Sequence, residues 1–257
     1  SLIGTDFIGT NFDGFVAGVF RSWGGFGYSN YIFQGWGLYS QLWAMVLLPP
    51  ALAASYRVLT DGRGYLLATS LLAMTLMSQI MYGYMAAVTL GAFTLITVIG
   101  ESNPRLLAGI LLVQWKRLAT LLLLVLIVTS YFLIPSFLDR EFFNSHAIYA
   151  PAITDSVGHK IAVAGFLNGD LFDWGRFPSF TILVTTGIGI CLLRWREKRY
   201  LIPVAIFFLW FLLFFGRTTW GYLIDVLPLS QYLHMHRFIG GVHLGGILLA
   251  AIALGTI

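Results

Sequence analysis

The sequence has few charged residues and a single cysteine, and both shortages limit what the protein can be. Charged residues make up 10% of the 257 residues, whereas a soluble domain carries about 25%. Hydrophobic residues make up 58% and the mean hydropathy is +0.82. These values argue against a soluble chain and exclude a disordered or collagen-like one. Because one cysteine cannot form an internal disulfide, a disulfide scaffold is also excluded.

Several signatures of known chemistries are missing as well. The sequence contains no CxxC, HExxH, GxxxxGK[ST] or GxSxG pattern. No run of basic residues interleaved with aromatic residues indicates nucleic acid as a partner. The long apolar stretches contain no Asp, Glu, Lys or Arg, so a proton or ion relay across a bilayer lacks its usual residues. No known metal-binding motif is present, and the sequence identifies no cofactor.

Seven apolar stretches can cross a bilayer, at roughly 20 residues per crossing. The second and third form one apolar run that is too long for a single span, so we expect a tight turn near Tyr82-Gly83-Tyr84. The composition and these stretches predict an all-α fold, a polytopic transmembrane bundle of about seven spans. The stretches cover residues 37–56, 64–82, 84–100, 118–137, 178–193, 200–216 and 239–257.

The remaining residues complete the predicted organisation. Between the third and fourth spans, Asn103 and Pro104 are suited to begin a helix that lies in the membrane interface. The sequence begins with serine and has no signal peptide, so we expect the C-terminal portion of a longer protein. The sequence divides into four predicted parts. Residues 1–36 form an external interfacial segment rich in glycine and aromatic residues, and residues 37–137 contain four spans with an interfacial helix near 104–116. Residues 138–177 form an external loop, and residues 178–257 contain three spans with an external loop at 217–238.

The charges assign sides to the connections between the predicted spans. The connections from span one to two, three to four and five to six, which we call side A, hold nine basic and three acidic residues. The opposite side, side B, holds six basic and eight acidic residues, and all five histidines lie there or at its border. Because cytoplasmic loops carry an excess of Lys and Arg, we expect side A in the cytoplasm and any active site on side B, facing the periplasm or exterior. The basic residues of side A are Arg57, Arg63, Arg105, Lys116, Arg117, Arg194, Arg196, Lys198 and Arg199.

The last external segment, GRTTWGYLIDVLPLSQYLHMHRFIGGVHLGG, holds the largest group of ionisable residues. A final helix that starts near Ser230 places His236 and His243 on one face and Arg237 on the next, in line with Gly241. In that position Arg237 can hold a phosphate or pyrophosphate at the membrane surface. Alternatively, Arg237 snorkels to the interface and the histidines are solvated.

Two acidic pairs are further candidates for a functional site. Asp6 and Asp13 are spaced to act as a general base or a metal-binding pair. Asp170 and Asp173 lie beside Trp174, and carboxylates next to an aromatic ring are common in sugar sites. The alternative for both pairs is a solvated external loop without a binding role.

Four stretches together resemble the GT-C superfamily of membrane glycosyltransferases. They are the glycine- and aromatic-rich segment leading into LWAMVLLPPALAASYRVL, the pair SQIMYGYMAAVTL, the insertion ending LFDWGRFPSF, and LLFFGRTTWGYLIDVLPLSQYLHMHRFIGGVHLGGILLAA. The likeness is to bacterial membrane proteins related by name to 6-pyruvoyl-tetrahydropterin synthase, and to multi-span proteins of the dolichyl-phosphate-mannosyltransferase type. It covers most of the chain, in patterns rather than in a fixed signature.

The resemblance implies an integral protein of the bacterial inner membrane that takes a sugar from a polyprenyl phosphate. A carboxylate would deprotonate the acceptor, and Asp13 or Asp6 would be its counterpart here. In the superfamily this carboxylate usually lies in the first external loop, after the first span, and we expect the present chain to begin downstream of that loop. Arg217, His236 and Arg237 would hold the leaving phosphate. Two other interpretations remain open: a non-catalytic subunit packed against other membrane subunits, and a carrier of polyprenol-linked lipids.

Overall fold

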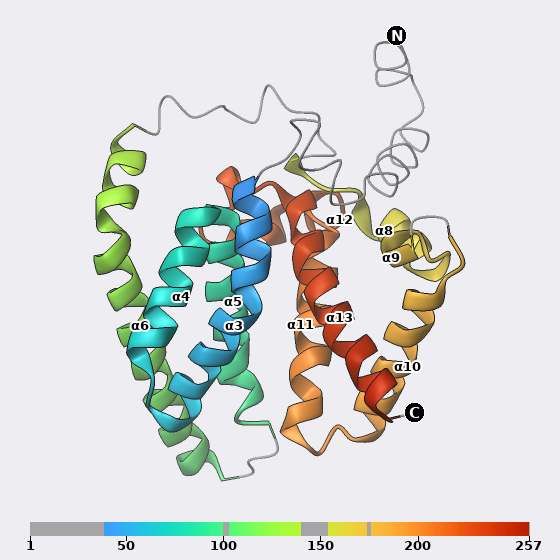
Figure 1. Cartoon of the computed structure of the whole chain (residues 1–257), viewed down its shortest axis with the longest axis horizontal. Coiled ribbons are helices and arrows are strands. Elements are labelled where there is room, and N and C mark those ends of the chain that lie inside the picture. Colours follow the sequence, from blue (N-terminus) through green and yellow to red (C-terminus); the bar gives the residue numbers. More distant parts are fainter. Residues whose placement is uncertain (1–38, 100–102, 140–153, 174–175, 257) are drawn as a thin grey trace. The chain divides into compact units, whose positions relative to one another are not determined.

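The computed structural model describes residues 39–99, 103–139, 154–173 and 176–256 (Figure 1). These residues form helices and connecting turns, and no strand occurs among them. The predicted all-α fold is therefore confirmed for the described part of the chain. The described residues divide into two compact units: unit 2 contains those within 39–139 and 191–209, and unit 1 contains those within 154–190 and 210–256.

Unit 2 is built around three antiparallel helices, α3 (Tyr39–Asp61), α4 (Tyr65–Ser78) and α5 (Ile80–Ile96). The helices α3, α4 and α5 pack against one another, and α6 (Pro104–Leu138) lies against α4 (Figure 1). Their contacts bury an apolar core that includes Leu59, Leu72, Tyr82, Leu90 and Leu121. The core forms because each helix is apolar all round and small or branched side chains fill the spaces between the helices.

The turn between α4 and α5 lies at Gln79, so the prediction of a turn at residues 82–84 is wrong by about one helical turn. Gln79 has an extended backbone, with φ −158° and ψ 114°, and both helices end or begin beside it. Gly83 belongs to α5 and serves the packing instead. A Cβ atom at Gly83 would lie 2.8 Å from the Leu76 Cα and would clash with it. Glycine has no Cβ atom, so it allows α4 and α5 to approach this closely.

Helix α6 joins two segments that the sequence analysis treats separately. Asn103 accepts a hydrogen bond from the Arg105 N–H and Pro104 occupies the first turn, as expected for the start of a helix. The helix does not stop before residue 118, however, and continues for 35 residues. At 1.5 Å per residue it is about 52 Å long, well beyond the roughly 30 Å of a hydrocarbon core. Part of α6 therefore extends outside any bilayer that it crosses.

Two basic residues of unit 2 bind the C-terminal ends of apolar helices. The Arg117 guanidinium on α6 donates to the carbonyl oxygens of Leu59 and Thr60, at 2.7 and 2.6 Å, at the end of α3. The Lys198 ammonium, at the start of α11 (Lys198–Phe214), donates to the Thr97 carbonyl at the end of α5. Carbonyl groups in the last turn lack helical partners and carry the negative end of the helix dipole. Both basic residues belong to the connections of side A, so the ends of α3 and α5 lie next to basic residues of that side.

Unit 1 contains shorter helices and irregular turns around one long helix, α13 (Ile239–Thr256). The other elements in chain order are α8 (Gly158–Leu167), α9 (Asp170–Asp173), α10 (Ser179–Leu193), the last turn of α11, α12 (Arg217–Trp220), and the 3-10 helices η3 (Gly221–Val226), η4 (Ser230–Tyr232) and η5 (Met235–Phe238). Helices α8 and α9 pack together (Figure 1).

Glycines allow three neighbours to approach α13 closely. A Cβ atom at Gly241 would lie 2.2 Å from the Trp210 ring, and one at Gly246 would lie 2.5 Å from the Phe172 ring. On α10, a Cβ atom at Gly187 would lie 2.1 Å from the Leu249 carbonyl oxygen. The glycines of α13 therefore mediate close packing, as glycine does at helix interfaces in membranes.

Every predicted span contains a helix, but length and composition support fewer than seven crossings. Three helical stretches of the described residues are long and apolar enough: Ser40–Asp61, Pro104–Leu138 and Met235–Thr256. A fourth results if α11 and the Arg217–Val226 stretch count as one span, although they meet at a bend of 73°. Helices α4, α5 and α10, with 14, 17 and 15 residues, are shorter apolar helices. By length and composition, three or four helical stretches of the described residues can therefore cross a membrane, instead of the seven spans predicted.

Candidate functional site

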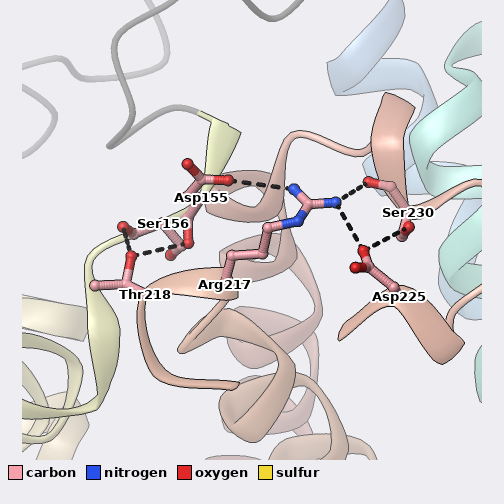
Figure 2. A network of polar contacts seen from close by, with 6 residues as sticks. All are labelled: Asp155, Ser156, Arg217, Thr218, Asp225 and Ser230. Atoms are coloured by element: carbon pink, nitrogen blue, oxygen red, sulfur yellow. Dashed lines mark hydrogen bonds and ion pairs between the residues drawn. The ribbon is translucent and has the colours of Figure 1, made fainter. Parts of the chain in front are cut away.

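The side chain of Arg217 connects three irregular segments of unit 1 (Figure 2). Its Nη1 lies 3.2 Å from the Asp155 carboxylate, before α8. Its Nη2 donates to the Ser230 carbonyl at 2.8 Å and lies 3.5 Å from the Asp225 carboxylate. The Ser230 hydroxyl also donates to the same Asp225 oxygen, at 3.1 Å. One guanidinium thus joins the turn at 155, the helix η3 and the helix η4, and we call these residues the Arg217 network.

The backbone around Arg217 explains why these segments meet. Gly216 has φ 64° and ψ −166°, a conformation that is essentially restricted to glycine. A Cβ atom there would lie 2.0 Å from the Asp155 carbonyl oxygen. Ser156 also has a positive φ, 68°, and its hydroxyl donates to the Phe214 carbonyl at the end of α11. The Thr218 hydroxyl donates to the carbonyl oxygens of Asp155 and Ser156.

The charges of the Arg217 network do not balance. One guanidinium faces two carboxylates, so the cluster carries an excess negative charge when all three groups are ionised. The side chains of Arg217, Asp155 and Asp225 are 24%, 35% and 47% exposed, so water partly screens each ion pair. A phosphate at Arg217 would have to compete with both carboxylates. The geometry favours a positioning role for Arg217 over the phosphate-binding role that the sequence analysis gives it.

Asp173 has a defined structural partner, the N-terminus of α10. One carboxylate oxygen accepts from the Phe180 N–H at 2.8 Å, and the other accepts from the Thr181 N–H at 2.9 Å and the Thr181 hydroxyl at 2.7 Å. Asp173 is buried, with 8% of its surface exposed. A carboxylate in this position satisfies N–H groups that have no partner within the helix. Asp170, the other member of the pair, lies half-buried at the start of α9, and Trp174 lies outside the described residues.

His236 and Arg237 lie in η5, immediately before α13. The predicted regular helix from Ser230 is interrupted, since α13 begins at Ile239 and residues 230–238 form two 3-10 turns. His236 and Arg237 therefore do not lie on the continuous faces that the sequence analysis assigns to them. Both side chains are half-buried, and the His236 ring is 6.2 Å from the His234 ring and perpendicular to it.

His243, within α13, has a packing role. Its Nε2–H donates to the Leu171 carbonyl at 3.0 Å, and its ring lies 5.5 Å from the Phe172 ring.

His159, at the start of α8, contacts the Thr219 hydroxyl through its backbone N–H and its Nδ1. Among the described residues no three His, Cys, Asp or Glu side chains gather as metal ligands do. The candidates Asp6 and Asp13 lie outside the described residues.

The comparisons with known proteins find no matching family model, no similar curated protein and no similar solved structure. The Arg217 network is therefore characterised by its own geometry alone.

The sequence places Arg217 and Asp225 in one external segment but does not indicate Asp155, Ser156 or Ser230 as their partners. Asp155 lies 62 residues before Arg217, in a loop with no pattern of its own. The one local signal is Gly216 directly after an apolar helix, since a glycine there indicates a sharp change of backbone direction. Gly216 therefore indicates where the chain turns, but it does not identify Asp155 as the partner of Arg217.

Proposed function

We propose that the protein is an integral membrane protein that transfers a sugar from a polyprenyl-phosphate donor on side B. The observation that carries this proposal is the Arg217 network: a polar region of turns and short helices that follows the apolar helix α11. Catalytic residues are commonly held in such loops by a rigid scaffold, and strained backbone concentrates near functional sites. His236 and Arg237 follow the network in the sequence and are the candidates for binding the donor phosphate.

In this proposal all seven apolar helices cross the bilayer, with side A in the cytoplasm and the long loops outside. The basic end of unit 2 supports this orientation, because Lys and Arg accumulate on the cytoplasmic side. Helices α4, α5 and α10 are short for a crossing, and local thinning of the bilayer accommodates such helices at modest cost. In a bacterium the membrane would be the inner membrane.

The base in this mechanism is a carboxylate on side B. Among the described residues Asp225 is the best placed, because Arg217 and the Ser230 hydroxyl hold one of its oxygens and it is 47% exposed. Its second oxygen would accept the proton of the acceptor hydroxyl. The acceptor oxygen then bonds to the anomeric carbon while the bond to phosphate breaks, and the phosphate leaves with the electron pair near Arg237. Asp6 and Asp13 remain alternative bases.

The test uses the full chain in vesicles that contain a polyprenyl-phosphate-linked hexose, and it measures release of polyprenyl phosphate. We expect Asp225→Asn to lower the turnover rate at saturating donor and Arg237→Ala to weaken donor binding. Arg199→Ala, an exposed residue of side A, is the matched control and should leave both unchanged. Failure of the unmodified chain to bind or consume the donor would overturn the proposal.

A second function, that of a non-catalytic membrane subunit, is favoured by the surface of α6. Only 17% of the most apolar 18-residue part of α6 is buried inside the protein, compared with 61% for the corresponding part of Met235–Thr256. Lipid or another subunit would cover this surface. Co-purification of a stable partner with the chain, lost when Leu126 and Ile134 are changed to alanine, would support the subunit interpretation.

A further inference from the structure

The segment of residues 221–232, between α12 and η5, exposes an unusual amount of apolar surface. Tyr222 is 93% exposed and Val226 is 83% exposed. Three more large side chains of the same segment are also more than half exposed: Leu223, Leu229 and Tyr232. Single exposed apolar residues are ordinary on protein surfaces, but a continuous group of them marks a surface that contacts a protein or a membrane.

The opposite side of the segment is polar and fixed to unit 1. Asp225 and Ser230 both contact the Arg217 side chain (Figure 2). Ile224 is buried, with 2% of its surface exposed. Gly221 and Leu229 have positive φ values of 51° and 61°, which turn the chain before Tyr222 and again between Val226 and Tyr232. The segment therefore has two sides, one bound to Arg217 and one exposed and apolar.

The neighbours in sequence indicate what covers the exposed side. The apolar helix α11 ends at Phe214, and the candidate span Met235–Thr256 begins three residues after the segment. Helix α11 and the Arg217–Val226 stretch together are apolar enough for a span, but they are bent by 73°. A chain that leaves a bilayer at such a bend and re-enters it within about 20 residues stays close to the interface. Tyrosine is also enriched at that level.

We propose that residues 221–232 lie in the side B membrane interface, with Tyr222, Leu223 and Val226 in contact with lipid. Apolar residues on one side and polar residues on the other are typical of segments that lie in the interface rather than across the membrane. Arg217 holds the polar side and so determines which side chains face lipid. The proposal requires that the chain spans a membrane, but it does not depend on sugar transfer.

The test measures the depth of a spin label in the full chain reconstituted into phosphatidylcholine vesicles. Cys191, which is fully buried, is first changed to alanine. Single cysteines then replace Leu223 or Val226, and the collision rates of the nitroxide with oxygen and with a water-soluble nickel chelate are compared. Leu126→Cys on the exposed surface of α6 is the lipid reference, and Glu197→Cys in the turn after α10 is the aqueous reference.

We expect the oxygen-to-nickel collision ratio at 223 and 226 to be severalfold above that at 197 and close to that at 126. A ratio at 223 and 226 equal to that at 197 would place the segment in water and overturn the proposal. Labels immobilised and shielded from both reagents would mean that protein covers the segment, which would also overturn it. Because no activity is measured, loss of the sugar-transfer proposal would leave this result intact.

Discussion

The Arg217 guanidinium lies 3.2 Å from the Asp155 carboxylate, although 62 residues separate the two in the sequence. This pair links the turn before α8 to the start of α12. Through its second amino group Arg217 also reaches Asp225 and the Ser230 carbonyl. The Arg217 side chain is thus shared by the turn at 155, the helix η3 and the helix η4.

Removal of this guanidinium should destabilise unit 1. In Arg217→Gln the two carboxylates lose their cation and the Ser230 carbonyl loses its donor. We expect a loss of about 2 kcal/mol, because a hydrogen bond from a charged group contributes about 1.5–3 kcal/mol and each partly exposed ion pair less than about 1 kcal/mol. Thermal unfolding in detergent measures the change as a lower Tm.

Arg199→Gln provides the matched control, because Arg199 pairs with Glu197 in a turn where the two side chains are 72% and 49% exposed. Its Tm should fall little, since exposed ion pairs contribute little. Equal unfolding temperatures for Arg217→Gln and the parent chain would contradict the role of Arg217 as the connecting residue.

Asp173 should matter for stability and Asp170 should not. Asp173→Ala leaves the buried N–H groups of Phe180 and Thr181 without an acceptor, which costs about 1–3 kcal/mol. Asp173→Asn keeps one oxygen acceptor and should cost less. In unfolding experiments Asp170→Ala should remain within about 0.5 kcal/mol of the parent. If both alanine variants lost sugar binding and neither lost stability, the pair would be a sugar site and not a helix cap.

Arg117 should stabilise unit 2 through the end of α3. Arg117→Met removes two hydrogen bonds to the Leu59 and Thr60 carbonyls and should cost about 2 kcal/mol. Arg117→Lys keeps a positive charge near the C-terminus of the helix and should recover part of the loss. The exposed Arg105→Met is the control. A Tm of Arg117→Met equal to that of Arg105→Met would show that the contact contributes nothing.

The helices were predictable from the sequence where they depend on local properties, and the connections were not. Long apolar stretches predict helices because a backbone in lipid must satisfy its own hydrogen bonds, and each of the seven stretches contains one. The turn at Gln79 was missed because Gly83, the most obvious local signal, is used for contact with Leu76.

The candidate site was predictable only in part, for the same reason. Arg217, Asp225 and Ser230 lie in one short segment of the sequence, whereas Asp155 is 62 residues away from Arg217 and joins them only through folding. From the sequence, Asp173 is a sugar-site candidate or part of a solvated loop, and its structural partner, the N-terminus of α10, begins six residues later without a distinctive pattern. Asp6, Asp13 and Trp174 lie outside the described residues, and their roles stay predictions.

The sidedness of the chain is the claim on which the account depends, and cysteine labelling in intact cells tests it directly. In the Cys191→Ala background, a single cysteine replaces Lys160, exposed in α8, or Glu197, exposed in the turn after α10. A membrane-impermeant maleimide should label position 160 in intact cells and position 197 only after the membrane is permeabilised. Labelling of 197 in intact cells with protection of 160 would reverse the orientation and remove the external site with it.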